Sequence, residues 1–106
     1  MSMGVSIVTY PVDPAQGDEL TRRVHDHLVP AAQQVAGYRG FLLVEQADHR
    51  RLGLLLFDSL DGARAAQQVL GPLGREHTYG LMTGPAEGAL GTVILADGVF
   101  ADTASS

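Results

Sequence analysis

The hydrophobic positions of the chain fall into short segments whose spacing alternates between that of strands and that of helices. Residues 5–10 are rich in β-branched side chains, and apolar residues dominate 38–46 and 51–57, so each of these segments is predicted to be a strand. The polar residues 47–50 between the last two segments indicate a hairpin turn. A further strand is predicted over 92–96.

The segment after the first strand has helical spacing. Asp18 and Glu19 place negative charge where the positive end of a helix favours it. Apolar side chains then recur every three or four residues and form one stripe: Leu20, Val24, Leu28, Ala31 and Val35. Pro30 lies within the stripe and predicts a kink or a break, and Gly37 is predicted to end the helix.

A second helix is predicted after the third strand. Ser59 is a suitable N-cap, and the small apolar face consists of Ala63, Ala66, Val69, Leu70 and Leu73. Gly71 and Pro72 weaken the end of this helix, so residues 75–91, which are rich in glycine, are predicted to form a long loop.

The resulting order, βαββαβ, predicts an α+β protein with the ferredoxin-like arrangement. In this arrangement a four-stranded antiparallel sheet carries both helices on one face. The length predicts a single domain over 1–106, with its core at about 5–96. Residues 99–100 are expected to extend the sheet edge, and 103–106 are expected to be disordered.

The second and third strands have apolar residues at successive positions, so both of their faces are apolar. Phe41 and Leu43 alternate with Leu42 and Val44, whereas a sheet with one wet face shows polar residues at alternate positions. Two helices cover only one face. The other face therefore needs a partner, and we predict a homodimer that packs sheet against sheet and buries more than about 1,200 Å².

Composition narrows the classes of partner. The formal net charge is −5 and no Lys occurs, so binding to a nucleic acid or to an anionic membrane surface is not expected. The chain has no Cys, which excludes disulfides, thiolate metal sites and thiol nucleophiles. It shows neither a secretory signal pattern at residues 1–4 nor an apolar run long enough to span a bilayer, and we expect a cytoplasmic protein.

The topology and one sequence pattern resemble the dimeric α/β-barrel superfamily, and within it the antibiotic biosynthesis monooxygenase-like family. The pattern is Pro30 followed by the string GYRGFLLV at 37–44, which is similar to the family's entry to its second strand. Residues 55–63, LLFDSLDGA, are similar to its junction between third strand and second helix. The resemblance covers about 5–96.

This resemblance implies a small-molecule-binding dimeric barrel that acts as a cofactor-independent monooxygenase on an aromatic or polyketide-like substrate. Two alternatives stay open: a non-catalytic ligand-binding or structural dimer, and a small isomerase or lyase of the same superfamily. Haem-degrading members use an Asn, a Trp and a haem-ligating His, and this chain contains neither Asn nor Trp. No cofactor is therefore expected.

His77 and Tyr79 are the predicted catalytic residues. They open the glycine-rich segment after the second helix, where side chains can lean over a cavity between sheet and helices. A histidine titrates near neutral pH, so His77 could deprotonate a phenol or enol and prepare it for reaction with oxygen. The alternative is that both residues are ordinary surface residues.

Four aromatic residues are the predicted ligand-binding residues: Tyr10, Tyr38, Phe41 and Phe57. The tyrosines lie at strand ends and could offer a hydroxyl to a ligand, although such residues commonly bury the ring and keep the hydroxyl in water. The phenylalanines also suit plain core or dimer packing. His25 and His27 are two residues apart, which is the wrong helical spacing for a metal pair, and no metal site is predicted.

Overall fold

The computed structural model describes residues 2–98 of the chain. Its strands are β1 (Gly4–Pro11), β2 (Tyr38–Glu45), β3 (Arg50–Phe57) and β4 (Glu87–Thr92). Its helical segments are η1 (Pro14–Gln16), α1 (Gly17–Arg23), η2 (Val24–Leu28), α2 (Val29–Gln33) and α3 (Leu60–Thr78). The predicted extension at 99–100 and the predicted tail at 103–106 lie outside the described residues.

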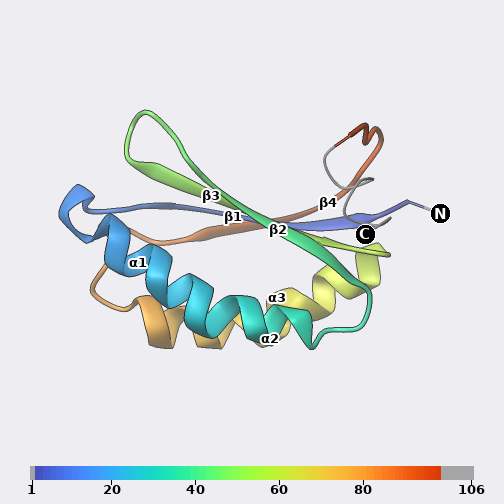
Figure 1. Cartoon of the computed structure of the whole chain (residues 1–106), viewed down its shortest axis with the longest axis horizontal. Helices are drawn as coiled ribbons and strands as arrows, with labels where there is room; N and C mark the ends of the chain where they lie inside the picture. The colour runs from blue at the N-terminus through green and yellow to red at the C-terminus, as the bar shows by residue number, and fades with distance from the viewer. Residues whose placement is uncertain (1, 99–106) are drawn as a thin grey trace.

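The four strands form one antiparallel sheet in the order β2-β3-β1-β4. The helices lie together on one side of this sheet, and its other side is bare (Figure 1). The α+β, ferredoxin-like arrangement predicted from the sequence is confirmed. No helix within 2–98 is long and apolar enough to cross a membrane.

The first helical segment changes its winding just before Pro30. Segments α1, η2 and α2 follow one another without a gap, and η2 is a π-helical turn in which the Val29 N–H bonds to the Val24 carbonyl. Such a wider turn accommodates a local disruption of the helical ladder. The disruption predicted at Pro30 is therefore present as a π turn, and the helix ends at Gln33, ahead of Gly37.

Helix α3 is longer than the sequence suggested. Its predicted start is confirmed, because the Ser59 hydroxyl accepts a hydrogen bond from the Gly62 N–H at 3.1 Å. The loop predicted over 75–91 is wrong at its start, since the helix continues through Gly71 and Pro72 to Thr78.

Contacts of its last turn explain why α3 persists beyond a proline. The Arg23 Nη1 donates a hydrogen bond to the His77 carbonyl at 3.0 Å, which satisfies a carbonyl that the helix end leaves free. The Thr78 hydroxyl donates to the Gly74 carbonyl within the same turn. Tertiary contacts of this kind supply most of the stability of helices in proteins, and here they outweigh the local cost of Pro72.

The last strand occupies a different segment from the predicted one. Strand β4 is Glu87–Thr92 rather than 92–96, and it pairs with β1 from Thr9↔Glu87 to Gly4↔Thr92. Its sequence, EGALGT, has low strand propensity, so periodicity could not identify it. Pairing along the β1 edge satisfies the backbone hydrogen bonds of this segment and decides its structure.

The core between sheet and helices consists of two buried clusters. One cluster contains Tyr10, Val12, Leu20, Val24 and Leu81. The other contains Ala32, Leu55, Phe57, Ala63 and Ala66. Phe41 is partly buried and packs against both clusters, so its ring links them.

Candidate functional site

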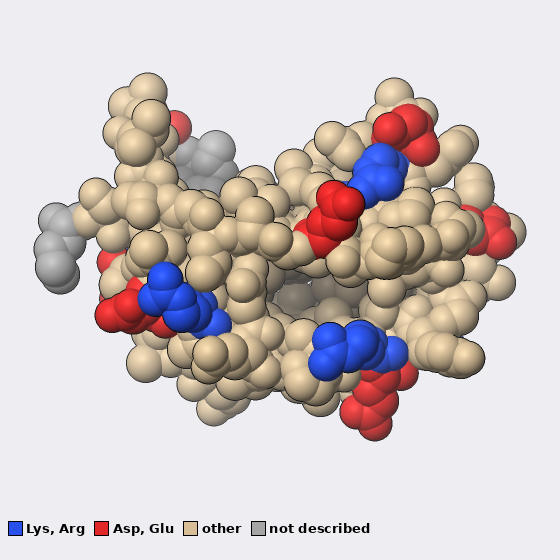
Figure 2. Space-filling view, turned by 180° about the vertical axis from the view of Figure 1, so that it is seen from behind, with Lys and Arg blue, Asp and Glu red and all other residues tan. Residues whose placement is uncertain are grey.

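A cavity of about 350 Å³ lies between the sheet and the helices. Figure 2 shows the molecule hollowed on this side, with basic and acidic side chains around the opening. The wall is mostly apolar and draws on both core clusters. The lining residues are Ser6, Val8, Tyr10, Val24, Leu28, Val29, Phe41, Leu43, Gly53, Leu55, Gln67, Leu70, Gly71, Gly74, Arg75, Thr78, Met82, Ala86 and Gly88.

Missing side chains account for much of this space. A Cβ placed on Gly74 would meet no atom within 4 Å, although Gly74 lines the cavity. Gly53 occupies the centre of the sheet below, where a Cβ would lie 3.0 Å from the Val8 Cγ1 and 3.6 Å from the Phe41 ring. Glycine at such positions costs a helix or strand about 0.5–1 kcal/mol relative to alanine. The glycines that line the cavity thus lower the local stability of the helix and strand that contain them.

The polar groups of the wall are few. Ser6 and Tyr10 come from β1 and are buried, and Gln67, Arg75 and Thr78 come from α3. Burial raises the pKa of the Tyr10 phenol above its ordinary value, and the nearby Arg51 opposes this rise only in part. The Tyr10 hydroxyl is therefore protonated at neutral pH and can donate a hydrogen bond.

Two of the four predicted ligand-binding residues line the cavity and two do not. Tyr10 and Phe41 line the cavity. Tyr38 and Phe57 do not, because their rings pack edge to face against each other with centroids 5.9 Å apart, and Phe57 is fully buried. The ligand-binding role of these four residues stays a prediction, and the lining of the cavity supports it for Tyr10 and Phe41.

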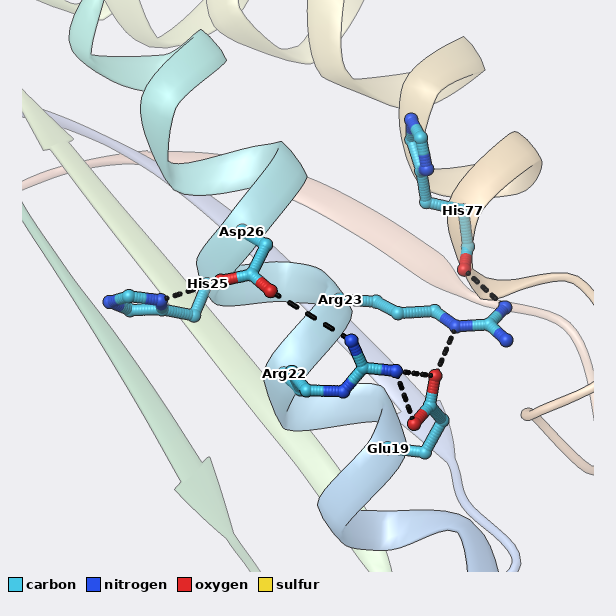
Figure 3. A network of polar contacts seen from close by, with 6 residues as sticks. All are labelled: Glu19, Arg22, Arg23, His25, Asp26 and His77. Carbon is cyan, nitrogen blue, oxygen red and sulfur yellow. Dashed lines mark hydrogen bonds and ion pairs between the residues drawn. The ribbon is translucent and has the colours of Figure 1, made fainter.

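The predicted catalytic residues lie near the cavity but are not among its lining. The His77 ring stacks on the His27 ring with centroids 4.0 Å apart and planes at 5°, which joins α3 to η2. Figure 3 shows the His77 ring turned away from the ion pairs of Glu19, Arg22 and Arg23, to which only its carbonyl is joined. The Tyr79 side chain is 86% exposed. Their catalytic roles stay predictions.

The histidines of the first helical segment have separate surroundings. The His25 Nδ1 lies 3.1 Å from an Asp26 carboxylate oxygen on the protein surface (Figure 3), whereas His27 stacks on His77. Within residues 2–98, no group of three or more His, Cys, Asp and Glu side chains is placed to hold a metal ion.

Sequence reasoning missed most polar residues of the wall. Gln67, Gly71, Arg75 and Thr78 follow one another at intervals of four, four and three residues, so they share one face of a helix, and Gly74 lies beside Arg75 on it. That stripe was a usable signal, but it becomes visible only if the helix continues past residue 75. Ser6 could have been identified in another way, because it is a polar residue between apolar neighbours in the first predicted strand.

Comparison with known proteins shows which solved structures have a similar fold. A scan against models of known families gives no match, and neither does a search of curated proteins. Among solved structures, a proposed antibiotic biosynthesis monooxygenase from Bordetella bronchiseptica matches with a TM-score of 0.74 at 16% identity, over 90% of this chain and 100% of that one. A monooxygenase of Streptomyces coelicolor in complex with nanaomycin D matches with a TM-score of 0.71 at 18% identity, over 91% of each chain.

A dimeric ferredoxin-like protein from an uncultured marine organism also matches, with a TM-score of 0.68 at 10% identity over 92% of each chain. The structural resemblance to the antibiotic biosynthesis monooxygenase-like and dimeric α/β-barrel proteins is thereby confirmed. At these identities the matches establish the fold.

A haem-degrading protein of Mycobacterium tuberculosis with two haems bound also matches in structure, with a TM-score of 0.70 at 21% identity, over 90% of this chain and 99% of that one. In this chain no histidine among residues 2–98 lines the cavity, and the His77 ring is engaged with His27. The chain also contains no Asn and no Trp, which the resemblance implies for a haem-degrading site. The residues of the wall therefore do not fit a haem-degrading centre.

Proposed function

We propose that this protein binds an apolar, ring-containing small molecule in the cavity between sheet and helices. The cavity volume of about 350 Å³ carries this proposal. Ligand pockets fall in the range of about 300–1,000 Å³ and combine apolar walls with a few polar groups that orient the ligand. Here Val, Leu and Phe side chains supply the walls, and Tyr10, Ser6 and Gln67 are among the orienting groups.

The activity that we propose for this site is oxidation of a phenolic or ketide-like ring without metal or flavin. In such a reaction a phenol and O₂ give a quinone and water: one oxygen atom forms the new carbonyl, the other leaves as water, and the substrate supplies all four electrons. The named resemblance to monooxygenases supports this step. His77 and Tyr79 are the proposed catalytic residues, and Tyr10, which lines the cavity, is proposed to hold the ring oxygen through its hydroxyl.

We further propose that the protein is a homodimer that packs bare sheet face on bare sheet face. This outer face, as we call it, carries the apolar side chains of Val5, Ile7, Leu42, Val44, Leu52 and Leu54, whose register partners place them opposite the cavity side. Leu42 and Val44 are 39% and 41% exposed in the single chain. Patches of this size and kind mark association sites in soluble proteins.

The ends of the sheet support the same arrangement. The β2–β3 hairpin and the segment after β4 both rise on the side of the sheet away from the helices (Figure 1). Ile94 and Leu95 of that segment are 96% and 85% exposed. A second copy of the sheet, packed against this side, would cover these two side chains. We also propose the cytoplasmic location that is expected from the sequence.

Filling the cavity tests the binding function. We expect 2-naphthol to bind the wild type in isothermal titration calorimetry and to lose its affinity for Gly74→Leu, whose side chain would enter the open space beside Gly74. Ala65→Leu is the matched control, because Ala65 is an exposed residue of α3 outside the lining. Equal binding by the two variants would contradict the proposed site.

Oxygen uptake separates the three functions that share this cavity. A monooxygenase consumes O₂ with anthrone or a naphthol panel, an isomerase or lyase converts its ligand without O₂, and a binding protein leaves the ligand unchanged. His77→Ala and Tyr79→Phe test the proposed catalytic residues in the same assay. Unchanged binding and turnover in both variants would exclude them from the chemistry.

A further inference from the structure

Arg75 is the one charged residue among the described residues that line the cavity. The chain as a whole carries a formal net charge of −5, yet neither Asp nor Glu contributes to the wall. An acidic protein has thus placed a single positive charge inside a mostly apolar pocket.

Most arginines of the molecule have an acidic partner. Arg22, Arg23, Arg39, Arg51 and Arg64 each form an ion pair. Arg75 forms no ion pair and no side-chain hydrogen bond with any residue in 2–98, and Arg50 is alike in lacking an ion pair there. The positive charge of Arg75 is therefore not neutralised by the part of the chain that the structure describes.

The guanidinium of Arg75 lies along the cavity side of α3. Its Nη1 is 3.9 Å from the position that a Cβ on Gly71 would occupy, and Gly71 itself lines the cavity one helical turn earlier. The absent side chain at Gly71 leaves room for the guanidinium head. Gly71 thus provides space for the Arg75 side chain, in addition to the open space beside Gly74.

The neighbouring polar groups of the wall favour the same kind of ligand. The Tyr10 phenol stays protonated and can donate. Thr78 follows Arg75 by three residues on the same helix face, and its hydroxyl is held by the Gly74 carbonyl. Among the described residues, the wall thus combines the Arg75 guanidinium with the Tyr10 donor and contains no carboxylate that would repel an anion.

We propose that Arg75 anchors an anionic group of the ligand, so that this cavity selects apolar ring compounds bearing a carboxylate over neutral rings of the same shape. The inference rests on the proposed binding function and adds the ligand's charge to it. A guanidinium presents parallel N–H groups that match a carboxylate in a bidentate pair. Because Arg75 is exposed on one side, solvent limits the gain to about tenfold in affinity.

The test compares two probes with one ring system, 2-naphthoate and the neutral 2-naphthamide. In calorimetry at low salt we expect the wild type to bind 2-naphthoate about tenfold more tightly than 2-naphthamide. Arg75→Gln should remove this preference and leave the affinity for 2-naphthamide unchanged. Added salt should weaken only the naphthoate complex, since it screens an exposed charge.

Arg50→Gln is the matched control, because Arg50 also lacks an ion pair within 2–98 but lies outside the cavity lining. This variant should keep the naphthoate preference. If the wild type binds both probes equally, or if Arg75→Gln keeps the preference, the role of Arg75 is overturned while the binding function stands. If neither probe binds the wild type, the binding function itself fails.

Discussion

The two faces of the sheet are apolar for different reasons. On the helix side, Ser6 and Val8 of β1 and Leu55 of β3 face helices that cover them incompletely and leave a cavity. On the outer face, Ile7 pairs with Leu54, and Leu54 pairs with Leu42 on the next strand, which gives an apolar surface. The helices of residues 2–98 all lie on the other side of the sheet (Figure 1). Alternation along each strand separates these two sets of side chains.

The difference shows how one sheet can serve two purposes. Glycines open the covered face, where Gly53, Gly74 and Gly88 line the hollow. Leucines and valines fill the outer face, as a surface requires if a second copy is to pack against it. In the function that we propose, a chain of 106 residues uses one face for a ligand and the other for association. Substitutions on either face should separate the two purposes.

The largest effect is expected from a charge on the outer face. Leu54→Glu would place an unpaired carboxylate at the centre of the proposed dimer contact, twice by symmetry, at a cost of about 3–5 kcal/mol or more. We expect analytical ultracentrifugation to show a dimer for the wild type and a monomer for the variant. Circular dichroism should be little changed.

Val69→Glu provides the comparison for this charge. Val69 lies on α3 and is 48% exposed, so its substitution puts the same charge on an apolar surface residue away from the outer face. The Val69→Glu variant should remain dimeric. A wild type that sediments as a monomer at micromolar concentration would contradict the proposed association outright.

The next effect, on the free energy of unfolding, is expected from Phe57, which is buried on the helix side of the sheet. Phe57→Ala removes a fully buried ring that packs against Tyr38 and should lower the free energy of unfolding by about 3–5 kcal/mol. Phe41→Ala should cost less, about 1–2 kcal/mol, because its ring already borders the cavity. Urea unfolding of both variants measures the contrast, and equal losses would show that the hollow is filled in solution.

The smallest effect concerns charge on the outside of the helices. Hydrogen bonds from Arg22 and Arg23 lower the pKa of Glu19 from 4.5 to about 2 (Figure 3). A carboxylate whose pKa is lower in the folded state stabilises the protein above pH 4.5, and this contribution disappears as pH falls towards 2.

Glu19→Gln should therefore lower the melting temperature slightly at pH 7, and the gap to the wild type should close as the pH approaches 2. High salt should shrink the gap at pH 7, since these side chains are solvated. Thermal melts at several pH values and two ionic strengths give the comparison. A gap that widens on acidification would contradict the assignment of the stabilisation to ionised Glu19.

The candidate site was predictable from the sequence only in part. Tyr10 and Phe41 were found because aromatic residues on predicted strands are conspicuous. Arg75 and Thr78 were missed because residues 75–91 were predicted to form a loop, and residues of a loop share no helix face. His77 looked like a cavity residue because it was placed on a loop, whereas the helix carries its ring onto His27.

Local sequence fixed whatever depends on near neighbours: the strands with β-branched and apolar residues, the cap at Ser59, the turn between β2 and β3 and the two-sided apolar character of the sheet. Tertiary contacts decided the rest. Strand β4 exists because the edge of β1 offers hydrogen bonds to a segment of weak propensity, and the end of α3 exists because Arg23 reaches the His77 carbonyl. The cavity, too, is a property of packing, since its lining residues come from strands and helices that lie far apart in the sequence.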